Sequence, residues 1–223
     1  MRKVCVFIAV VLLWSVGAAH AATIQLGSLT GNDFIDWKQM SSSYTEAAPI
    51  IGTSVIVTTN LGRFVTAANP DGTAWFREGS LWLGDFAPGE YLLSADAQSE
   101  VLTFTTPVAA LGAQIQATAF GIFAAQLQLF DSLNNLLGTF SVLGSNDGSE
   151  DDSNPFLGAA SDSANIAKAI FSITFNNQDF GLGLGRVELS DTSRVVVTPE
   201  PATLTLMAIG AVGIIRRRFS RAA

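Results

Sequence analysis

The sequence is nearly devoid of the two side chains that most often carry enzyme chemistry. Its 223 residues include one cysteine, Cys5, and one histidine, His20. Both lie in an N-terminal segment that we expect to be removed on export. Without that segment the chain has no thiol and no imidazole. This excludes a Ser-His-Asp triad, a Cys-His pair, an intrachain disulfide and a zinc site built from cysteine and histidine.

The N-terminal segment has the three parts of a secretory signal peptide. Residues 2–3 are basic, residues 4–16 are apolar, and Ala19 and Ala21 supply the small residues before a cleavage site. Cleavage after Ala21 by signal peptidase would leave Ala22 as the new N-terminus. An uncleaved N-terminal anchor is the alternative, and the short apolar stretch argues against it.

Positive charge is scarce in the body of the chain, residues 22–198. This body has 18 acidic and six basic residues, which gives it a formal charge of −12. Such a surface repels the phosphate backbone of nucleic acids and anionic lipids, so we expect no nucleic-acid partner. The same charge keeps an exported protein soluble without requiring any partner.

The last 25 residues have a distinct organisation. Residues 202–215 form an apolar run without any charge, and at about 1.5 Å per residue this run spans about 21 Å as a helix, less than the roughly 30 Å of a bilayer core. A short core helix is therefore one interpretation. The charges at one end favour a membrane helix whose basic end stays in the cytoplasm. The run is preceded by Pro199, Glu200 and Pro201 and followed by Arg216, Arg217 and Arg218.

Together these features resemble the PEP-CTERM sorting signal of Gram-negative bacteria. The resemblance implies export, transient anchoring in the inner membrane and recognition by an exosortase-type processing enzyme. It also implies that the released protein resides at the cell surface or in the extracellular matrix. The resemblance covers only residues 199–223, so it says nothing about what the body does.

The body has the period-two alternation of β-strands that have one buried and one exposed face. It occurs at residues 102–105, 114–117, 126–129 and 171–175, and residues 54–59 are β-branched and apolar, which also favours a strand. Turn sequences lie between these segments, at residues 69–72, 87–90 and 134–135. We therefore predict a mainly β protein, an antiparallel β-sandwich or jelly roll, with an N-terminal signal helix and a short C-terminal transmembrane helix. The expected domains are a signal peptide at 1–21, a sandwich at 22–198 and a sorting tail at 199–223.

Several short segments of the body, in this order, are similar to the β-sandwich domain often found upstream of PEP-CTERM tails. They lie at residues 82–90, 102–104, 111–116, 137–140 and 156–158. This resemblance implies a fold and no established activity. The glycine-rich residues 181–185 lack a following helix, so we interpret them as the entry to a last strand at 186–189.

Three kinds of site remain compatible with the composition. Trp75 and Trp82 could stack on sugar rings, although buried tryptophans more often fill a core. Two carboxylates across a cleft could hydrolyse a glycoside, and candidates near aromatic residues are Asp85, Glu90, Asp96 and Glu100. Oxygen ligands in the most acidic stretch could hold calcium, although their spacing is not that of an EF-hand; these are Asp147, Glu150, Asp151 and Asp152. A solvated loop is the alternative for that stretch.

We therefore expect an exported, non-enzymatic surface or matrix protein, structural or adhesive in a biofilm or exopolysaccharide. A carbohydrate-binding module is the alternative, and a glycoside hydrolase that depends on carboxylates is less favoured. The expected partners are signal peptidase, an exosortase-type enzyme, the inner membrane in transit and exopolysaccharide. No cofactor other than calcium is expected.

Overall fold

The computed structural model describes residues 23–40, 50–51, 54–70, 73–78, 84–95, 98–174 and 181–192, with only the backbone given for 50–51 and 73–78. The predicted signal peptide and sorting tail lie outside these residues, as do Trp82 and Asp96. The described residues belong to one unit of the chain, residues 1–193. No helix among them is long and apolar enough to cross a membrane.

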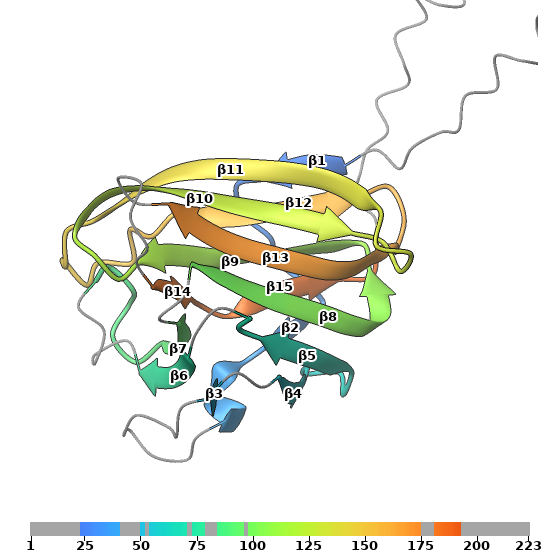
Figure 1. Ribbon diagram of the computed structural model, residues 1–223, viewed down its shortest axis with the longest axis horizontal. Coiled ribbons are helices and arrows are strands. Elements are labelled where there is room, and N and C mark those ends of the chain that lie inside the picture. Colours follow the sequence, from blue (N-terminus) through green and yellow to red (C-terminus); the bar gives the residue numbers. More distant parts are fainter. Residues whose placement is uncertain are drawn as a thin grey trace, which may run out of the picture. The chain divides into compact units, whose positions relative to one another are not determined.

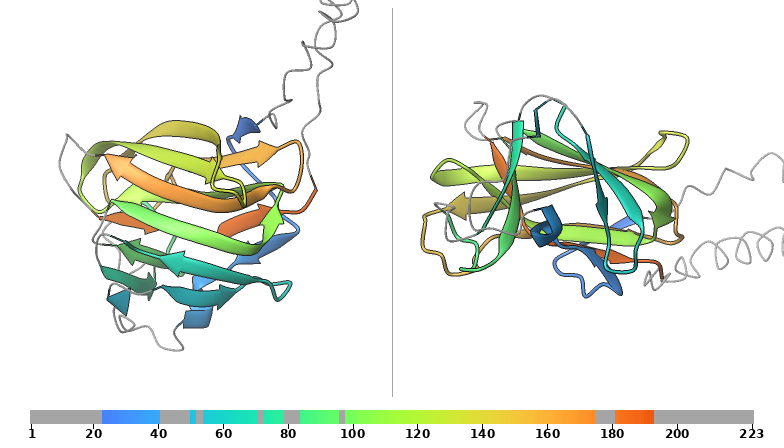
Figure 2. Two further views of the ribbon diagram at one scale, coloured as in Figure 1. Left: turned by 45° about the vertical axis from the view of Figure 1, so that its right-hand side comes forward. Right: turned by 90° about the horizontal axis from the view of Figure 1, so that it is seen from below.

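Two antiparallel sheets form the two layers of a sandwich (Figures 1 and 2). The smaller sheet has the order β11-β10-β13-β8-β5-β4, which runs from top to bottom in Figure 1. Its strands are β4 (Val55–Thr58), β5 (Phe64–Ala68), β8 (Ser99–Val108), β10 (Gly121–Phe130), β11 (Leu136–Asn146) and β13 (Ile166–Thr174). The predicted mainly β sandwich is confirmed.

The larger sheet has the order β1-β12-β9-β14-β7-β6-β3, and β15 pairs with both β9 and β2. Its strands are β1 (Thr23–Leu26), β2 (Asp33–Ile35), β3 (Ile50–Ile51), β6 (Thr73–Glu78), β7 (Tyr91–Ala95), β9 (Ala110–Ala117), β12 (Phe156–Ser161), β14 (Leu182–Leu184) and β15 (Val187–Ser190). A short 3-10 helix, η1 (Trp37–Met40), follows β2.

The apolar residues of both sheets meet in one core between the layers. Strand β10 shows the predicted alternation most clearly: Leu127 and Leu129 are fully buried, whereas Gln126 is exposed on the other face. Ile35 and Trp37, from β2 and η1, also enter this core. Burial of such side chains contributes about 1.5–3 kcal/mol each, so the core is the main source of stability.

Two predicted turns are confirmed by their backbone geometry. Asn134, between β10 and β11, has a φ of 65°, a left-handed conformation that asparagine tolerates. Gly89 has a φ of 85°, and the turn is closed by the N–H of Glu90, which donates to the carbonyl of Ala87 at 3.2 Å. This turn carries Glu90 toward the outer face of the larger sheet.

Two features of the larger sheet differ from the prediction. Strand β9 was predicted to have one wet face, but Gln116 on that face is fully buried because Asp85 covers it and exchanges hydrogen bonds with its side chain. The glycine-rich segment was predicted as a strand entry, but it contains a strand of its own, β14, which pairs with β7 and β9. In both cases contacts from remote segments override the local pattern.

Candidate functional site

A depression of about 570 Å³ lies on the outer face of the larger sheet, the face turned away from the core. It forms where the last part of the sheet is interrupted. Strands β14 and β15 both pair with the same edge of β9, but they then diverge, β14 toward β7 and β15 toward β2. The lining residues are Leu29, Asp36, Lys38, Ala87, Gly89, Glu90, Tyr91, Gln114, Asp152, Phe156, Arg186 and Glu188.

Gly185 occupies the interruption and is held from both sides of the sheet. Its N–H donates to the carbonyl of Gln114 at 3.0 Å, and its own carbonyl accepts the indole N–H of Trp37 at 2.9 Å. A Cβ at this position would lie 2.6 Å from Oε1 of Glu90. Glycine at this position lets the Glu90 side chain lie close to the backbone, and a larger residue would require that side chain to move.

An aromatic ring forms part of the floor of the depression. Phe156 is half-buried, and its ring rests on Gly112 of β9 and Gly158 of β12, which lie opposite each other in the sheet. A Cβ at Gly112 would lie 2.4 Å from Cζ of the ring, and a Cβ at Gly158 would lie 2.6 Å from Cε1. The two glycines thus let the ring lie down on the sheet.

Polar and charged side chains surround this ring. Gln114 donates from Nε2 to Oδ1 of Asp152 at 2.7 Å. Glu188 pairs with Arg186 through Oε1 at 2.5 Å, and its Oε2 accepts the N–H of Gly31 at 3.2 Å. Hydrogen bonds and an ion pair therefore fix the orientation of Asp152 and Glu188 in the absence of a ligand.

Two cations at the rim contact aromatic rings. The guanidinium of Arg186 lies 4.8 Å from the centroid of the Phe34 ring, and the ammonium of Lys38 lies 5.6 Å from that of Tyr91. Both distances are within the range of cation–π contacts.

Glu90 is the carboxylate most affected by this environment. Burial raises its pKa, and the negative charge of Asp152 raises it further. The N–H of Arg186, which donates to Oε1 of Glu90 at 3.4 Å, and the charge of Arg186 act in the opposite direction. Glu90 is thus a partly desolvated acid whose pKa is raised further by the charge of a second acid in the lining, Asp152.

Asp85 holds the acidic loop that follows β11. It is buried, and its carboxylate accepts the backbone N–H groups of Gly148 at 2.7 Å, Ser149 at 3.0 Å and Asp147 at 3.2 Å. It also accepts Nε2 of Gln116 at 2.8 Å. Asp85 therefore has a positioning role, because it fixes the loop that carries Asp152 to the depression.

The predicted calcium residues occupy this loop but do not converge on one point. Asp147 accepts the N–H of Ser149, Asp151 accepts that of Ser153, and Asp152 binds Gln114. Glu150 is exposed and has a φ of 54°. In the part of the chain that the structure describes, no three acidic side chains are grouped as a metal site. The geometry adds no support for the calcium hypothesis.

The predicted carboxylate candidates are separated by the fold. Glu90 lines the depression, Asp85 is buried beneath the loop, and Glu100 points from β8 into the interior. Trp75 lies in β6 opposite Ser94, and only its backbone is described. Sequence reasoning missed Phe156, whose role depends on two glycines in strands that are paired only in the fold.

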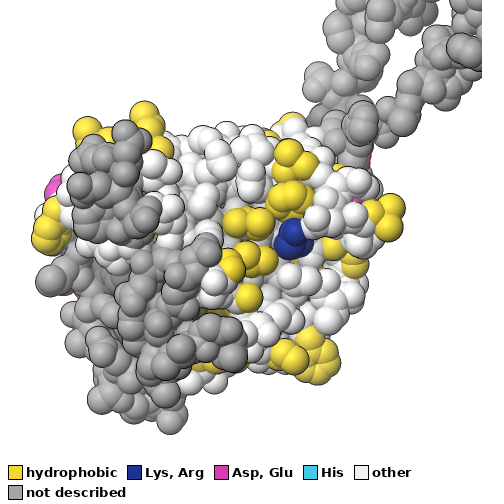
Figure 3. Space-filling view, viewed as in Figure 1, with side chains coloured by type: hydrophobic (Ala, Val, Ile, Leu, Met, Phe, Trp, Pro, Cys, Tyr) yellow, Lys and Arg dark blue, Asp and Glu magenta, His cyan; other side chains and the backbone are white. Residues whose placement is uncertain are grey.

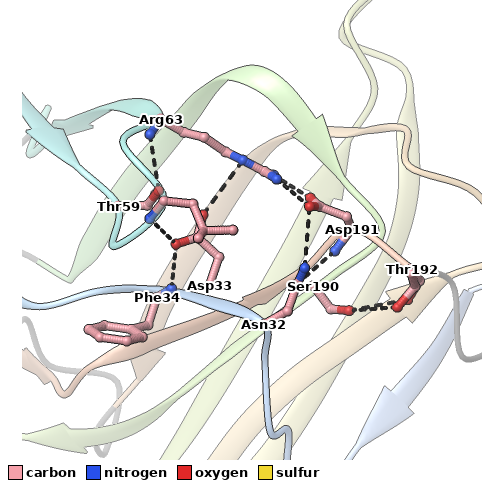
Figure 4. Close-up of polar contacts among 9 residues, drawn as sticks. Asn32, Asp33, Phe34, Thr59, Arg63, Ser190, Asp191 and Thr192 are labelled. Atoms are coloured by element: carbon pink, nitrogen blue, oxygen red, sulfur yellow. Dashed lines mark hydrogen bonds and ion pairs between the residues drawn. The ribbon is translucent and has the colours of Figure 1, made fainter.

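A second cluster of charges lies at the end of β15 and is structural (Figure 4). Arg63 forms a two-pronged ion pair with Asp191, and its Nε lies 3.6 Å from Oδ2 of Asp33. The other oxygen of Asp33 accepts the N–H groups of Phe34 and Leu61, both at 2.9 Å. The cluster ties β2, the β4–β5 turn and the end of β15 together. Its hydrogen bonds with Arg63 lower the pKa of Asp191.

No curated protein has significant sequence similarity to this chain. Solved structures with a similar fold include a DUF4465 family protein from Bacteroides caccae, at 12% identity and a TM-score of 0.44, which covers 71% of this chain and 99% of its own. Another is CsCBM6-3 from Clostridium stercorarium in complex with cellobiose, at 15% identity and a TM-score of 0.25, which covers 67% and 95%.

A third similar structure is a glycoside hydrolase family 43 arabinoxylan arabinofuranohydrolase from Bacillus subtilis in complex with cellotetraose. It has 14% identity and a TM-score of 0.27, and the match covers 64% of this chain but only 27% of the hydrolase.

The sorting tail matches a family model directly. Residues 197–218 match the PEP-CTERM protein-sorting motif, which contains the Pro-Glu-Pro triplet and the three consecutive arginines noted above. This confirms the resemblance seen in the sequence. The chain therefore carries a PEP-CTERM protein-sorting motif, and it is an exported protein that is anchored through its C-terminal tail and then reaches the cell surface.

Proposed function

We propose that the sandwich is a carbohydrate-binding module, and that the depression on the outer face of the larger sheet is its binding site. The observation that carries the proposal is the Phe156 ring, which rests on two glycines at the floor of a depression with polar walls. Sugar rings present apolar C–H faces that pack on aromatic rings, and hydroxyl groups at their edges. The aromatic ring below would contact the apolar face of a sugar. The carboxylate, amide and guanidinium groups at the sides would form hydrogen bonds with its hydroxyl groups.

The size of the site also supports this function. A volume of about 570 Å³ falls within the roughly 300–1,000 Å³ of sites that bind small molecules. The polar groups are held by neighbouring atoms, as Asp152 is by Gln114 and Glu188 is by Gly31. Such preorganisation lowers the entropic cost of binding.

In this proposal the protein is adhesive: it holds exopolysaccharide or biofilm matrix to the cell surface. Signal peptidase would remove residues 1–21, the inner membrane would hold the chain in transit, and an exosortase-type enzyme would process the tail at 199–223. Residues 22–198 would then form the mature module. A purely structural matrix role is the second candidate, and it predicts no retention on polysaccharide.

Retention on polysaccharides tests the proposal. The purified full chain is passed over immobilised cellulose, chitin, chitosan, a galactan and pectate, and the retained fraction is measured with and without competing soluble polymer. Phe156→Ala should weaken retention about tenfold, because a stacking contact of about 1.4 kcal/mol is lost. Phe64→Ala removes an aromatic ring from the other sheet, where Phe64 is more exposed than Phe156, so it is the control for the loss of a ring as such.

Thermal unfolding of both variants separates a loss of binding from a loss of fold. Absence of retention on every polymer, with the protein folded, would contradict the module and favour the structural role. Release of new reducing ends from a retained polymer would show hydrolysis instead, with Glu90 and Asp152 as the carboxylates to test.

A further inference from the structure

The charges around the depression specify its ligand more narrowly, provided that the proposed carbohydrate function holds. We infer that the site takes an amino sugar whose amine is free and protonated, with Glu90 and Asp152 as the groups that receive the ammonium. The aromatic floor makes the depression a sugar site independently of these acids. The acids then determine which sugar it prefers.

The lining residues carry more negative than positive charge. Four of the described lining residues are acids, namely Asp36, Glu90, Asp152 and Glu188, and two are bases, Lys38 and Arg186. Arg186 is already engaged, since it pairs with Glu188 and lies over the Phe34 ring. The field inside the depression therefore favours a cation and opposes a uronate or a sulfated sugar.

The four acids are not equally available to a ligand. Glu188 uses both oxygens, one for Arg186 and one for the N–H of Gly31. Glu90 and Asp152 each use one oxygen, for the N–H of Arg186 and for Gln114 respectively. Among the described residues, neither has a partner on its second oxygen. Asp36 also uses one oxygen, for the N–H of Lys38. Of the lining acids that keep an oxygen for a ligand, Glu90 and Asp152 are the two whose charges act on each other.

An ammonium suits these acceptors better than a hydroxyl group does. Glu90 is partly removed from water and faces the like charge of Asp152, an arrangement that also raises the pKa of Glu90. A positive charge next to both acids would relieve their repulsion, and hydrogen bonds between charged groups are about twice as strong as neutral ones. An N-acetyl group offers neither the charge nor the extra donors.

Calorimetric titration of the full chain with matched tetrasaccharides tests this inference. The ligands are the tetramers of glucosamine, N-acetylglucosamine and galacturonate, at physiological ionic strength and a mildly acidic pH that keeps the amines protonated. We expect the glucosamine tetramer to bind about tenfold more tightly than its N-acetylated counterpart, which corresponds to about 1.4 kcal/mol. The galacturonate tetramer should bind most weakly.

Three variants separate the site from the general attraction of an acidic protein for a cation. Glu90→Gln and Asp152→Asn keep the shape of each side chain, so each should remove most of the preference for the free amine. Glu150→Gln removes one charge from the same acidic loop, but Glu150 does not line the depression. This control should keep the preference, and thermal unfolding should show that all three variants are folded.

The outcomes for this inference and for the proposed function are distinguishable. Equal or tighter binding of the N-acetylated tetramer would overturn the amine preference while leaving carbohydrate binding intact. An equal loss in Glu150→Gln and Glu90→Gln would also overturn it, because the attraction would then belong to the whole acidic surface. Failure of the protein to bind any tetrasaccharide or polysaccharide would instead reject the proposed function.

Discussion

The outer faces of the two sheets differ in almost every property that matters for binding. The six strands of the smaller sheet contain two charged residues, Lys168 on the outer face and Glu100, which is buried. Its outer face presents mostly Ser, Thr, Gln and aliphatic side chains. In Figure 3, the part of this side that is not grey is mainly white and yellow, with a dark blue patch. The outer face of the larger sheet is instead partly covered by loops that bring charged side chains to it.

The difference shows where this sandwich has room for a site. Both sheets use the same alternation to build the core, so their outward positions are equally open to substitution. Among the described residues, the larger sheet is interrupted at Gly185, and loops there deliver acids, bases and rings to one place. A rigid scaffold with functional loops is a common arrangement in binding proteins.

The largest effect on stability should come from Glu100, the one acidic residue in the strands of the smaller sheet. Burial raises the pKa of Glu100 to about 8 from 4.5, opposed by a hydrogen bond with Asn69. The folded state thus keeps a proton that the unfolded chain loses. The free energy of unfolding should therefore fall as the pH rises between these two values, in total by on the order of 4 kcal/mol.

Chemical denaturation at several pH values measures this effect. Glu100→Gln should lack this part of the pH dependence, whereas Glu150→Gln, an exposed acid on the other side, should keep it. An unchanged pH slope in Glu100→Gln would mean that the carboxyl is charged inside the fold.

On the side of the larger sheet, the substitution that should reduce the free energy of unfolding most is that of Asp85. Replacing Asp85 with alanine removes the acceptor for three backbone N–H groups and for Gln116, at a cost of at least about 3 kcal/mol. Hydrogen exchange of residues 147–149 should rise sharply in this variant. Asp147→Ala, a neighbouring exposed acid, should change the free energy of unfolding much less, and equal effects would contradict the positioning role of Asp85.

A smaller loss of stability should follow from adding a methyl group beneath the Phe156 ring. A Cβ at Gly158 would lie 2.6 Å from the Phe156 ring, so Gly158→Ala should displace the ring and destabilise the protein by about 1–3 kcal/mol. Retention on polysaccharide should fall with it. At Gly27 no atom lies within 4 Å of the added Cβ, which makes Gly27→Ala the control; normal retention by Gly158→Ala would remove the ring from the site.

The smallest effect on stability should come from adding a charge to the outer face of the smaller sheet. Thr103 is exposed in the middle of the smaller sheet, so Thr103→Glu should change the free energy of unfolding by less than about 0.5 kcal/mol. Retention on polysaccharide should stay the same. A loss of retention would show that the outer face of the smaller sheet contributes to binding. The two outer faces would then not differ in function.

The sequence predicts the parts of this protein that depend on local pattern. Alternation located β8, β10 and β13, and a run of β-branched apolar residues located β4. Asparagine and glycine marked the turns at 134–135 and 87–90. The sorting motif was also recognisable, because it is a continuous stretch with a fixed order of parts. The signal peptide boundary and the domain limits stay predictions.

The proposed binding site could not be predicted in the same way. Phe156 becomes a floor only because Gly112 lies opposite Gly158, and that register joins strands more than 40 residues apart in the chain. Gln116 is buried only because Asp85 reaches it from a loop 31 residues away. Such placements depend on which strands pair, and no local alternation encodes that choice.

The position of β15 has a mechanical consequence for a protein tethered by its tail. This strand precedes the tail in the chain and is hydrogen-bonded on both edges, to β9 and to β2, while Arg63 grips Asp191 at its end. A pull on the chain at the end of β15 would load the bonds on both of its edges. A cut before residue 191 would separate Asp191 from this strand and from its ion pair with Arg63.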